Sequence, residues 1–282
     1  MRGAAGVRRP RTRRVPDAWG RPYGVTLPIM LVAAAVCPCP PLLVPEVAAG
    51  AAPELDTARA ACADALDVLA AARPDRLVVV GPDDGAGPGD AGPRTYPEGA
   101  RGSFRGFGVD LGVRLGRPGR DAGAGRELPY ALAVAAWLLE RAGWAAAPVE
   151  GLAVGEALAA ERCLDAGREI AARAGRVALL VMGDASACRT LKAPGYLDER
   201  AAPFDAAVAR ALGAADAPAL AALDAGLARA LRVSGRAPWQ VLAGAAQGTA
   251  LDGALLYEDA PYGVGYLVAT WSRSGIPAGH RP

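Results

Sequence analysis

Histidine is almost absent from this chain. His280 is the only histidine in 282 residues, and it lies close to the C-terminus. Sites that hold iron or zinc with several histidines, and hydrolases that use a Ser-His-Asp triad, therefore lack their usual groups. Lysine is equally rare, with Lys192 alone, and there is no G-x-x-x-x-G-K-[ST] sequence. The absence of that motif argues against a P-loop nucleotide site.

The chain also lacks long apolar runs and a regular cysteine framework. No stretch approaches the roughly 20 apolar residues of a membrane-spanning helix. The cysteines number five, which is odd, and their spacing is irregular. This usage favours reduced thiols and a cytoplasmic location. With 52% hydrophobic and 21% charged residues, the composition is that of a globular protein with a sizeable core.

Positive charge is concentrated at the N-terminus. Residues 1–28 hold seven arginines and one acid, and the remainder holds 24 basic and 28 acidic residues, or −4. We expect 1–28 to be a disordered extension that is dispensable, with the folded part beginning at Met30. A nucleic-acid contact and a targeting segment are the other interpretations of these residues. The acidic body shows no basic stripe, so neither a nucleic-acid nor a membrane partner is predicted.

Apolar runs and helical periodicities alternate along the chain. We predict buried strands at Leu31–Val36, Arg76–Val80, Val109–Leu115, Trp144–Val149 and Arg176–Met182, and strands near the C-terminus at Ala254–Tyr257 and Val264–Trp271. We predict helices at Glu54–Ala72, Leu128–Arg141, Glu156–Ala174, 204–213, 218–232 and 238–246.

These elements predict one α/β domain over residues 30–272, followed by a flexible tail over 273–282. Buried strands that alternate with amphipathic helices indicate a three-layer α/β/α fold with a mostly parallel, mixed central sheet. Residues 81–106 are expected to form a long Gly/Pro-rich loop. Within it, Gly87–Gly92 matches G-x-G-x-x-G, but no helix is expected to follow, which argues against a dinucleotide site.

Ligands of α/β sheets bind outside the carboxyl ends of the strands, so the residues after each strand are the first candidates. These are Cys37–Pro41, Gly81–Asp84, Gly183–Thr190 and Glu258–Gly263. The candidate cleft residues that they supply are Cys39, Asp83, Asp84, Asp184, Ser186, Cys188, Glu258 and Tyr262.

Several blocks, in order, are similar to one known family. They are Met30–Glu46, with its proline-rich end, the loop Gly183–Ala187, the helix start Pro203–Val208, the segment Trp239–Ala246, and the closing Tyr257-Glu258 and Gly263–Tyr266. Together they resemble the B-subunit-like proteins of the class III extradiol ring-cleaving dioxygenases, in particular an actinobacterial branch. The resemblance covers most of residues 30–271 and implies the three-layer α/β/α fold of that family.

The resemblance implies iron chemistry that this chain is not equipped to perform. The family binds Fe(II) with two histidines and a carboxylate, and a further histidine acts as acid or base. Cys39 stands at the first histidine position, and Asp83 or Asp84 near the second. Ala187 or Cys188 stands at the acid–base histidine, and Glu258 is a candidate remnant of the carboxylate. The resemblance therefore supports the fold and argues against ring cleavage.

Three interpretations of Cys39 remain open. It can be a packed core residue, a reactive thiol, or, with Asp83 and Glu258, part of an atypical Fe²⁺ or Zn²⁺ site. Asp184 and Ser186 can contact a ligand or cap the turn after a strand. Arg189 and Lys192 can neutralise an anionic ligand or lie in solvent.

The leading functional hypothesis is a degenerate family member, without a resident cofactor, that keeps a cleft for a small molecule or a partner. A metal-dependent oxidoreductase acting on a catechol-like aromatic is the alternative. Association into a homo-oligomer, or with a small partner subunit, is also expected from the resemblance.

Overall fold

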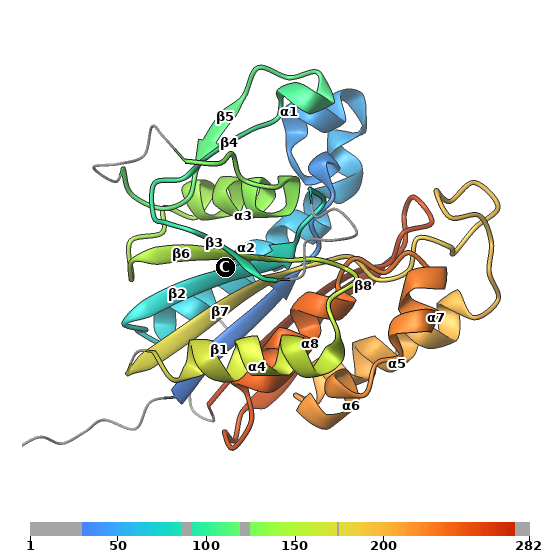
Figure 1. Cartoon of the computed structure of the whole chain (residues 1–282). Coiled ribbons are helices and arrows are strands. Elements are labelled where there is room, and N and C mark those ends of the chain that lie inside the picture. Colours follow the sequence, from blue (N-terminus) through green and yellow to red (C-terminus); the bar gives the residue numbers. More distant parts are fainter. Residues whose placement is uncertain (1–29, 86–91, 119–124, 174, 274–282) are drawn as a thin grey trace, which may run out of the picture.

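The computed structural model describes residues 30–85, 92–118, 125–173 and 175–273. In this part of the chain a seven-stranded sheet has the order β3-β6-β2-β7-β1-β9-β8, and β4 and β5 form a separate two-stranded sheet (Figure 1). The strands are β1 (Met30–Cys37), β2 (Arg76–Pro82), β3 (Arg94–Tyr96), β4 (Arg101–Ser103), β5 (Gly112–Arg114), β6 (Val149–Val154), β7 (Arg176–Met182), β8 (Asp252–Asp259) and β9 (Tyr266–Ser272).

The four central strands β6, β2, β7 and β1 run parallel to one another. Strand β3 is antiparallel to β6 at one edge, and β9 is antiparallel to both β1 and β8 at the other. The predicted α/β fold with a mostly parallel, mixed sheet is therefore confirmed. In β1, Leu31–Cys37 are all buried, as expected of a strand that is covered on both faces.

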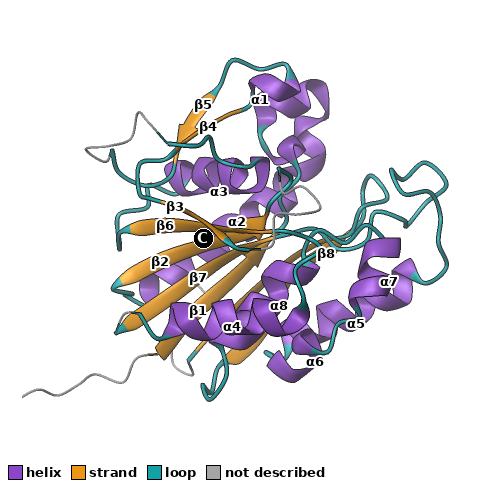
Figure 2. Ribbon diagram, in the orientation of Figure 1, coloured by secondary structure: helices purple, strands orange, loops and turns teal. Residues whose placement is uncertain are grey.

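Helices cover both faces of the sheet (Figure 2). The helices are α1 (Pro45–Ala48), α2 (Asp56–Ala71), α3 (Tyr130–Arg141), α4 (Ala160–Ala171), α5 (Ala201–Gly213), α6 (Ala217–Ala221), α7 (Ala225–Ala230) and α8 (Arg236–Ala245). One core lies between the sheet and α2 and α3, and a second lies between the sheet and α4, α5 and α8.

Three parts of the sequence-based prediction were wrong. The helix expected over 218–232 is divided into α6 and α7, and the Asp224 side chain caps the start of α7. The strand expected at Trp144–Val149 is β6, which starts only at Val149, because Pro148 cannot donate a backbone hydrogen bond within a ladder. The loop expected over 81–106 contains β3 and β4, and β4 pairs with β5, a shorter strand than Val109–Leu115. These three-residue strands are too short to show a periodicity.

Other expectations fall where nothing is described. The predicted extension over 1–28 lies outside the described residues, as do the tail beyond residue 273 and residues 87–91 of the Gly-rich segment. Within the described residues, no helix is both long and apolar enough to cross a membrane.

Candidate functional site

Strand β7 occupies a special place in the sheet, between β1 and β2. The chain leaves β1 and β2 toward α2 and α3 on one face, whereas it leaves β7 toward α5 and α8 on the other. Connections that diverge to opposite faces leave a crevice at the carboxyl ends of the strands, where α/β proteins bind ligands. Cys39, Asp83 and Asp184 follow these three strands, so the topology predicts the site at this edge.

Asp184 and Cys39 are brought together there. The backbone N–H of Cys39 donates to Asp184 Oδ1 at 2.8 Å, and the backbone N–H of Asp184 donates to Ser234 Oγ at 2.9 Å. Cys39 is fully buried, whereas Asp184 keeps part of its surface exposed. Burial raises the pKa of Asp184 to about 7, and the Cys39 N–H opposes that rise. Asp184 can therefore gain or lose a proton near neutral pH.

Tyr130, the first residue of α3, lies near this pair. It was not among the candidate residues predicted from the sequence. Its hydroxyl lies near the Cys39 thiol, as does the side chain of Ser234. The nearby acidic groups of Cys39, Asp184 and Asp84, together with burial, raise the pKa of Tyr130 strongly. Burial, followed by Asp184, raises the pKa of Cys39 as well. At neutral pH the site thus holds a phenol and a thiol in their protonated forms.

A cleft of about 810 Å³ opens beside Tyr130. Its lining combines charged side chains with aromatic rings: Asp83, Asp84, Arg94, Tyr96, Arg105, Phe107, Arg126, Glu127 and Tyr130 take part. A second hollow of about 570 Å³ adjoins it and shares Tyr96, Ser103, Arg105, Arg126 and Glu127. Both volumes are within the range of small-molecule sites. The candidate site is therefore a polar cleft with Tyr130 in its wall and the Cys39–Asp184 pair close by.

The Asp83 carboxylate is ion-paired with Arg94 of strand β3. It accepts from Arg94 Nη1 at 2.7 Å and from the backbone N–H of Gly85 at 3.1 Å. Asp84 is exposed, and burial by its surroundings, followed by the charge of Asp83, raises its pKa. Both predicted residues line the cleft, and Asp84 is the more accessible of the two.

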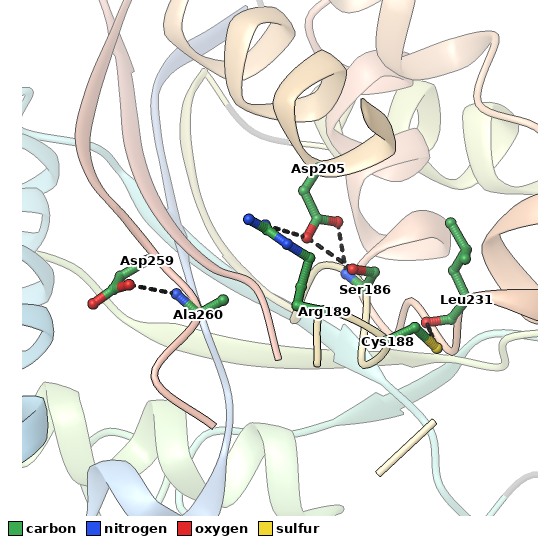
Figure 3. Close-up of polar contacts among 7 residues, drawn as sticks. All are labelled: Ser186, Cys188, Arg189, Asp205, Leu231, Asp259 and Ala260. Carbon is green, nitrogen blue, oxygen red and sulfur yellow. Dashed lines mark hydrogen bonds and ion pairs between the residues drawn. The ribbon is translucent and has the colours of Figure 1, made fainter. Parts of the chain in front are cut away.

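Ser186 belongs to a buried network of hydrogen bonds with Asp205 and Arg189, called the Asp205 lock (Figure 3). Its backbone N–H and its hydroxyl donate to the two carboxylate oxygens of Asp205 at 2.9 and 2.8 Å, and Arg189 Nη1 donates to Asp205 at 3.0 Å. Ser186 is fully buried, and Asp205 is 1% exposed. The lock fastens the loop after β7 to α5. Of the two interpretations of Ser186, the structural one fits this geometry, and Arg189 serves the protein's own carboxylate.

The remaining predicted residues lie apart from the cleft. The Cys188 thiol points to the carbonyl oxygen of Leu231 at 3.5 Å, away from the Asp205 lock (Figure 3). Glu258 is exposed on the edge strand β8. Tyr262 lies near Glu54, which precedes α2. Cys188 and Tyr262 follow strands as predicted, whereas Glu258 lies within β8, which extends to Asp259. The sequence could not show which way the loops after the strands turn.

The atypical metal site is not assembled. Among the described residues, no three His, Cys, Asp or Glu side chains lie close enough to hold a metal ion. Cys39 is fully buried beside Tyr130 and Ser234, Asp83 is ion-paired with Arg94, and Glu258 is exposed on β8. Cys39, Asp83 and Glu258, which the resemblance predicted as ligands, therefore do not form a metal site in the described part of the chain.

Comparisons with known proteins identify no family for this chain. No family model matches the sequence, and no curated protein matches it. Among solved structures, it is similar to a crystal structure of an uncharacterized protein from Escherichia coli, with 13% identity over 86% of this chain and 99% of that chain, and a TM-score of 0.46. A likeness at this level carries no argument about function.

Proposed function

We propose that this chain binds a small molecule in the cleft beside Tyr130, on a scaffold like that of the B subunits of class III extradiol dioxygenases, and does not perform their iron-dependent ring cleavage. The observation that carries the proposal is the cleft itself. It lies beyond the carboxyl end of β2, beside Tyr96 of β3 and Tyr130 at the start of α3, and charged and aromatic side chains line it.

The residues around the cleft favour binding and proton exchange over metal chemistry. The ring-cleaving family needs two histidine ligands, whereas the chain has only one histidine. Asp184 titrates near neutral pH, and Tyr130 can donate a hydrogen bond to a ligand. Neither group requires a cofactor.

A ligand screen tests the binding proposal. A compound that binds only the native state raises the melting temperature, by an amount that grows with its concentration relative to Kd. The full-length chain, without a polyhistidine tag, is screened with catechols, aromatic acids, amines and nucleotides. A hit should lose affinity when Ser103→Trp fills the space shared by both hollows, and should keep it in Asp64→Asn on the exposed side of α2. A flat response to every class contradicts the proposal.

Metal content tests the rejection of iron chemistry. The same untagged chain is loaded with Fe(II) without oxygen, desalted, and analysed for metal. We expect far less than one iron per chain. Close to one iron per chain, lost in Cys39→Ser, together with oxygen uptake in the presence of a catechol, would restore the oxidoreductase alternative.

The resemblance also leads us to propose that the chain associates with a second copy or with a small partner subunit. Light scattering of the purified chain, and co-purification from native extract, measure the two forms of association separately. A monomer that purifies alone contradicts this part of the proposal.

A further inference from the structure

Two of the three arginines that line the cleft are paired with carboxylates. Arg94 donates to Asp83 at 2.7 Å, and Arg105 Nε donates to Asp110 at 2.7 Å. Arg126 lies near Tyr96, and among the described residues it makes no ion pair. An arginine that is paired with a carboxylate contributes little net positive potential to a ligand beside it, because the two charges cancel at short range.

Several carboxylates near the cleft have no such partner. Asp84 and Glu127 both line the cleft, and neither makes an ion pair within the described residues. Two further carboxylates, Asp184 and Glu156, act electrostatically on Tyr130 in the cleft wall. Among the described lining residues, the unpaired carboxylates of Asp84 and Glu127 therefore outnumber the one unpaired arginine, Arg126.

Aromatic rings stand at the same end. Phe107 is 45% exposed, and its ring meets that of Tyr130 edge-on, with centroids 6.4 Å apart and an interplanar angle of 78°. Both rings line the cleft. A cation over an aromatic face gains about 0.5–2 kcal/mol, and exposed apolar rings also bind apolar ligand surface.

We propose that this end of the cleft binds a small organic cation, an amine carried on an apolar or aromatic body, with the ammonium group at Asp84 and the body against Phe107 and Tyr130. This inference rests on the proposed function and names its ligand class. An organic anion of the same shape would meet the uncompensated carboxylates, whereas Arg94 and Arg105 could reach it only by leaving their carboxylate partners.

The pKa of Asp84 agrees with the assignment of a cation to this position. Burial, followed by the neighbouring Asp83, raises the pKa of Asp84, so its ionised form lacks a stabilising cation. An ammonium group within hydrogen-bond reach supplies that cation. The resulting attraction weakens as ionic strength rises, because the cleft is open to solvent.

Two phenyl ligands of opposite charge test the inference. The full-length untagged chain is titrated calorimetrically with benzylamine and with benzoate, at about pH 7.5 and low salt. We expect benzylamine to bind at least about tenfold more tightly than benzoate. Asp84→Asn should weaken benzylamine about three- to tenfold, and Phe107→Leu, which removes the ring but keeps apolar bulk, about threefold. The exposed Asp64→Asn on α2 is the matched control and should change neither affinity.

The outcomes separate this inference from the proposed function. If benzoate binds as tightly as benzylamine, or if Asp84→Asn has no larger effect than Asp64→Asn, the cation assignment is wrong. If benzylamine fails while a catechol or a carboxylate from the screen binds in the cleft, the proposed function stands and the inference fails. If no compound of any class binds, both fail.

Discussion

Two carboxylates near the end of β7 have opposite surroundings. Asp205 is buried against three donors, one of them the guanidinium of Arg189. Asp184 accepts one hydrogen bond, from the backbone of Cys39, and the titratable groups that face it are Cys39, Tyr130 and Tyr266, all of them acids. A cation therefore neutralises Asp205, whereas burial without a cation brings the pKa of Asp184 to about 7. One region is built as a lock, and the other holds a proton that can exchange.

Removing the Asp205 carboxylate should have the largest effect on stability. Asp205→Ala leaves the backbone N–H and hydroxyl of Ser186 without their acceptor and Arg189 without its partner. Breaking a buried ion pair from one side costs about 3–5 kcal/mol. Urea unfolding measures the loss. The control, Asp198→Ala, breaks the exposed pair with Arg200 and should cost under about 1 kcal/mol. Equal losses in the two variants would show that the lock contributes no special stability.

Removing the Arg189 guanidinium should leave the Asp205 carboxylate, like that of Asp184, buried without a counter-charge. In Arg189→Leu, Asp205 keeps its two Ser186 donors but loses its counter-charge, so we expect a loss of about 2 kcal/mol at pH 8. Arg200→Leu, which breaks the exposed pair with Asp198, is the control and should cost under about 1 kcal/mol. Equal losses in the two arginine variants would contradict this comparison.

Asp184 itself should make stability depend on pH in a defined direction. Its pKa in the folded protein, about 7, lies above the usual 3.8, so the native state holds a proton that the unfolded state releases between these values. The free energy of unfolding from this group therefore falls as pH rises from about 4 to 7 and is level above that. Because Asp184 is partly exposed, we expect a fall on the order of 1–2 kcal/mol.

Asp184→Asn should abolish that fall while keeping the acceptor for the Cys39 N–H. Urea unfolding at about pH 5 and pH 8 measures it. The variant should match the wild type more closely at pH 5, where the wild-type side chain is also neutral. An unchanged pH dependence would assign the titration to another group.

Asp84→Asn should have the smallest effect on stability, under about 0.5 kcal/mol, because the side chain is exposed. Its effect should appear in ligand affinity instead. Thermal unfolding with and without benzylamine compares the two quantities in one experiment. A large loss of stability without ligand would place Asp84 with the lock rather than with the cleft.

The sequence was most informative where a run of apolar residues is buried on both faces. The predicted strand Arg176–Met182 is β7, and the predictions at Leu31–Val36 and Arg76–Val80 lie within β1 and β2. The rule that ligands lie beyond the carboxyl ends of strands then placed Cys39 and Asp184 at one edge. The same rule could not find Tyr130, because it opens α3 and three short strands separate it from β2.

The partners of these residues could not be predicted. Ser234 lies 50 residues from Asp184, and Asp205 lies 19 residues from Ser186 on a different element. A sequence shows that a residue is charged, but it does not show whether that residue has an ion-pair partner. Pairing depends on which helices cover which face of the sheet, and hydrophobic periodicity gives a helix its buried side without naming its neighbour.

The amino-acid sequence by itself determined the strands of the sheet centre, the alternation of strand and helix, and the set of polar residues at the carboxyl edge, because these follow from local periodicity and from residue types. Only the tertiary structure decided which carboxylate received an arginine and which did not. That choice depends on distances of a few ångströms between segments far apart in the chain, over which burial and the Coulomb energy change a carboxyl group from a fixed charge into a titratable one.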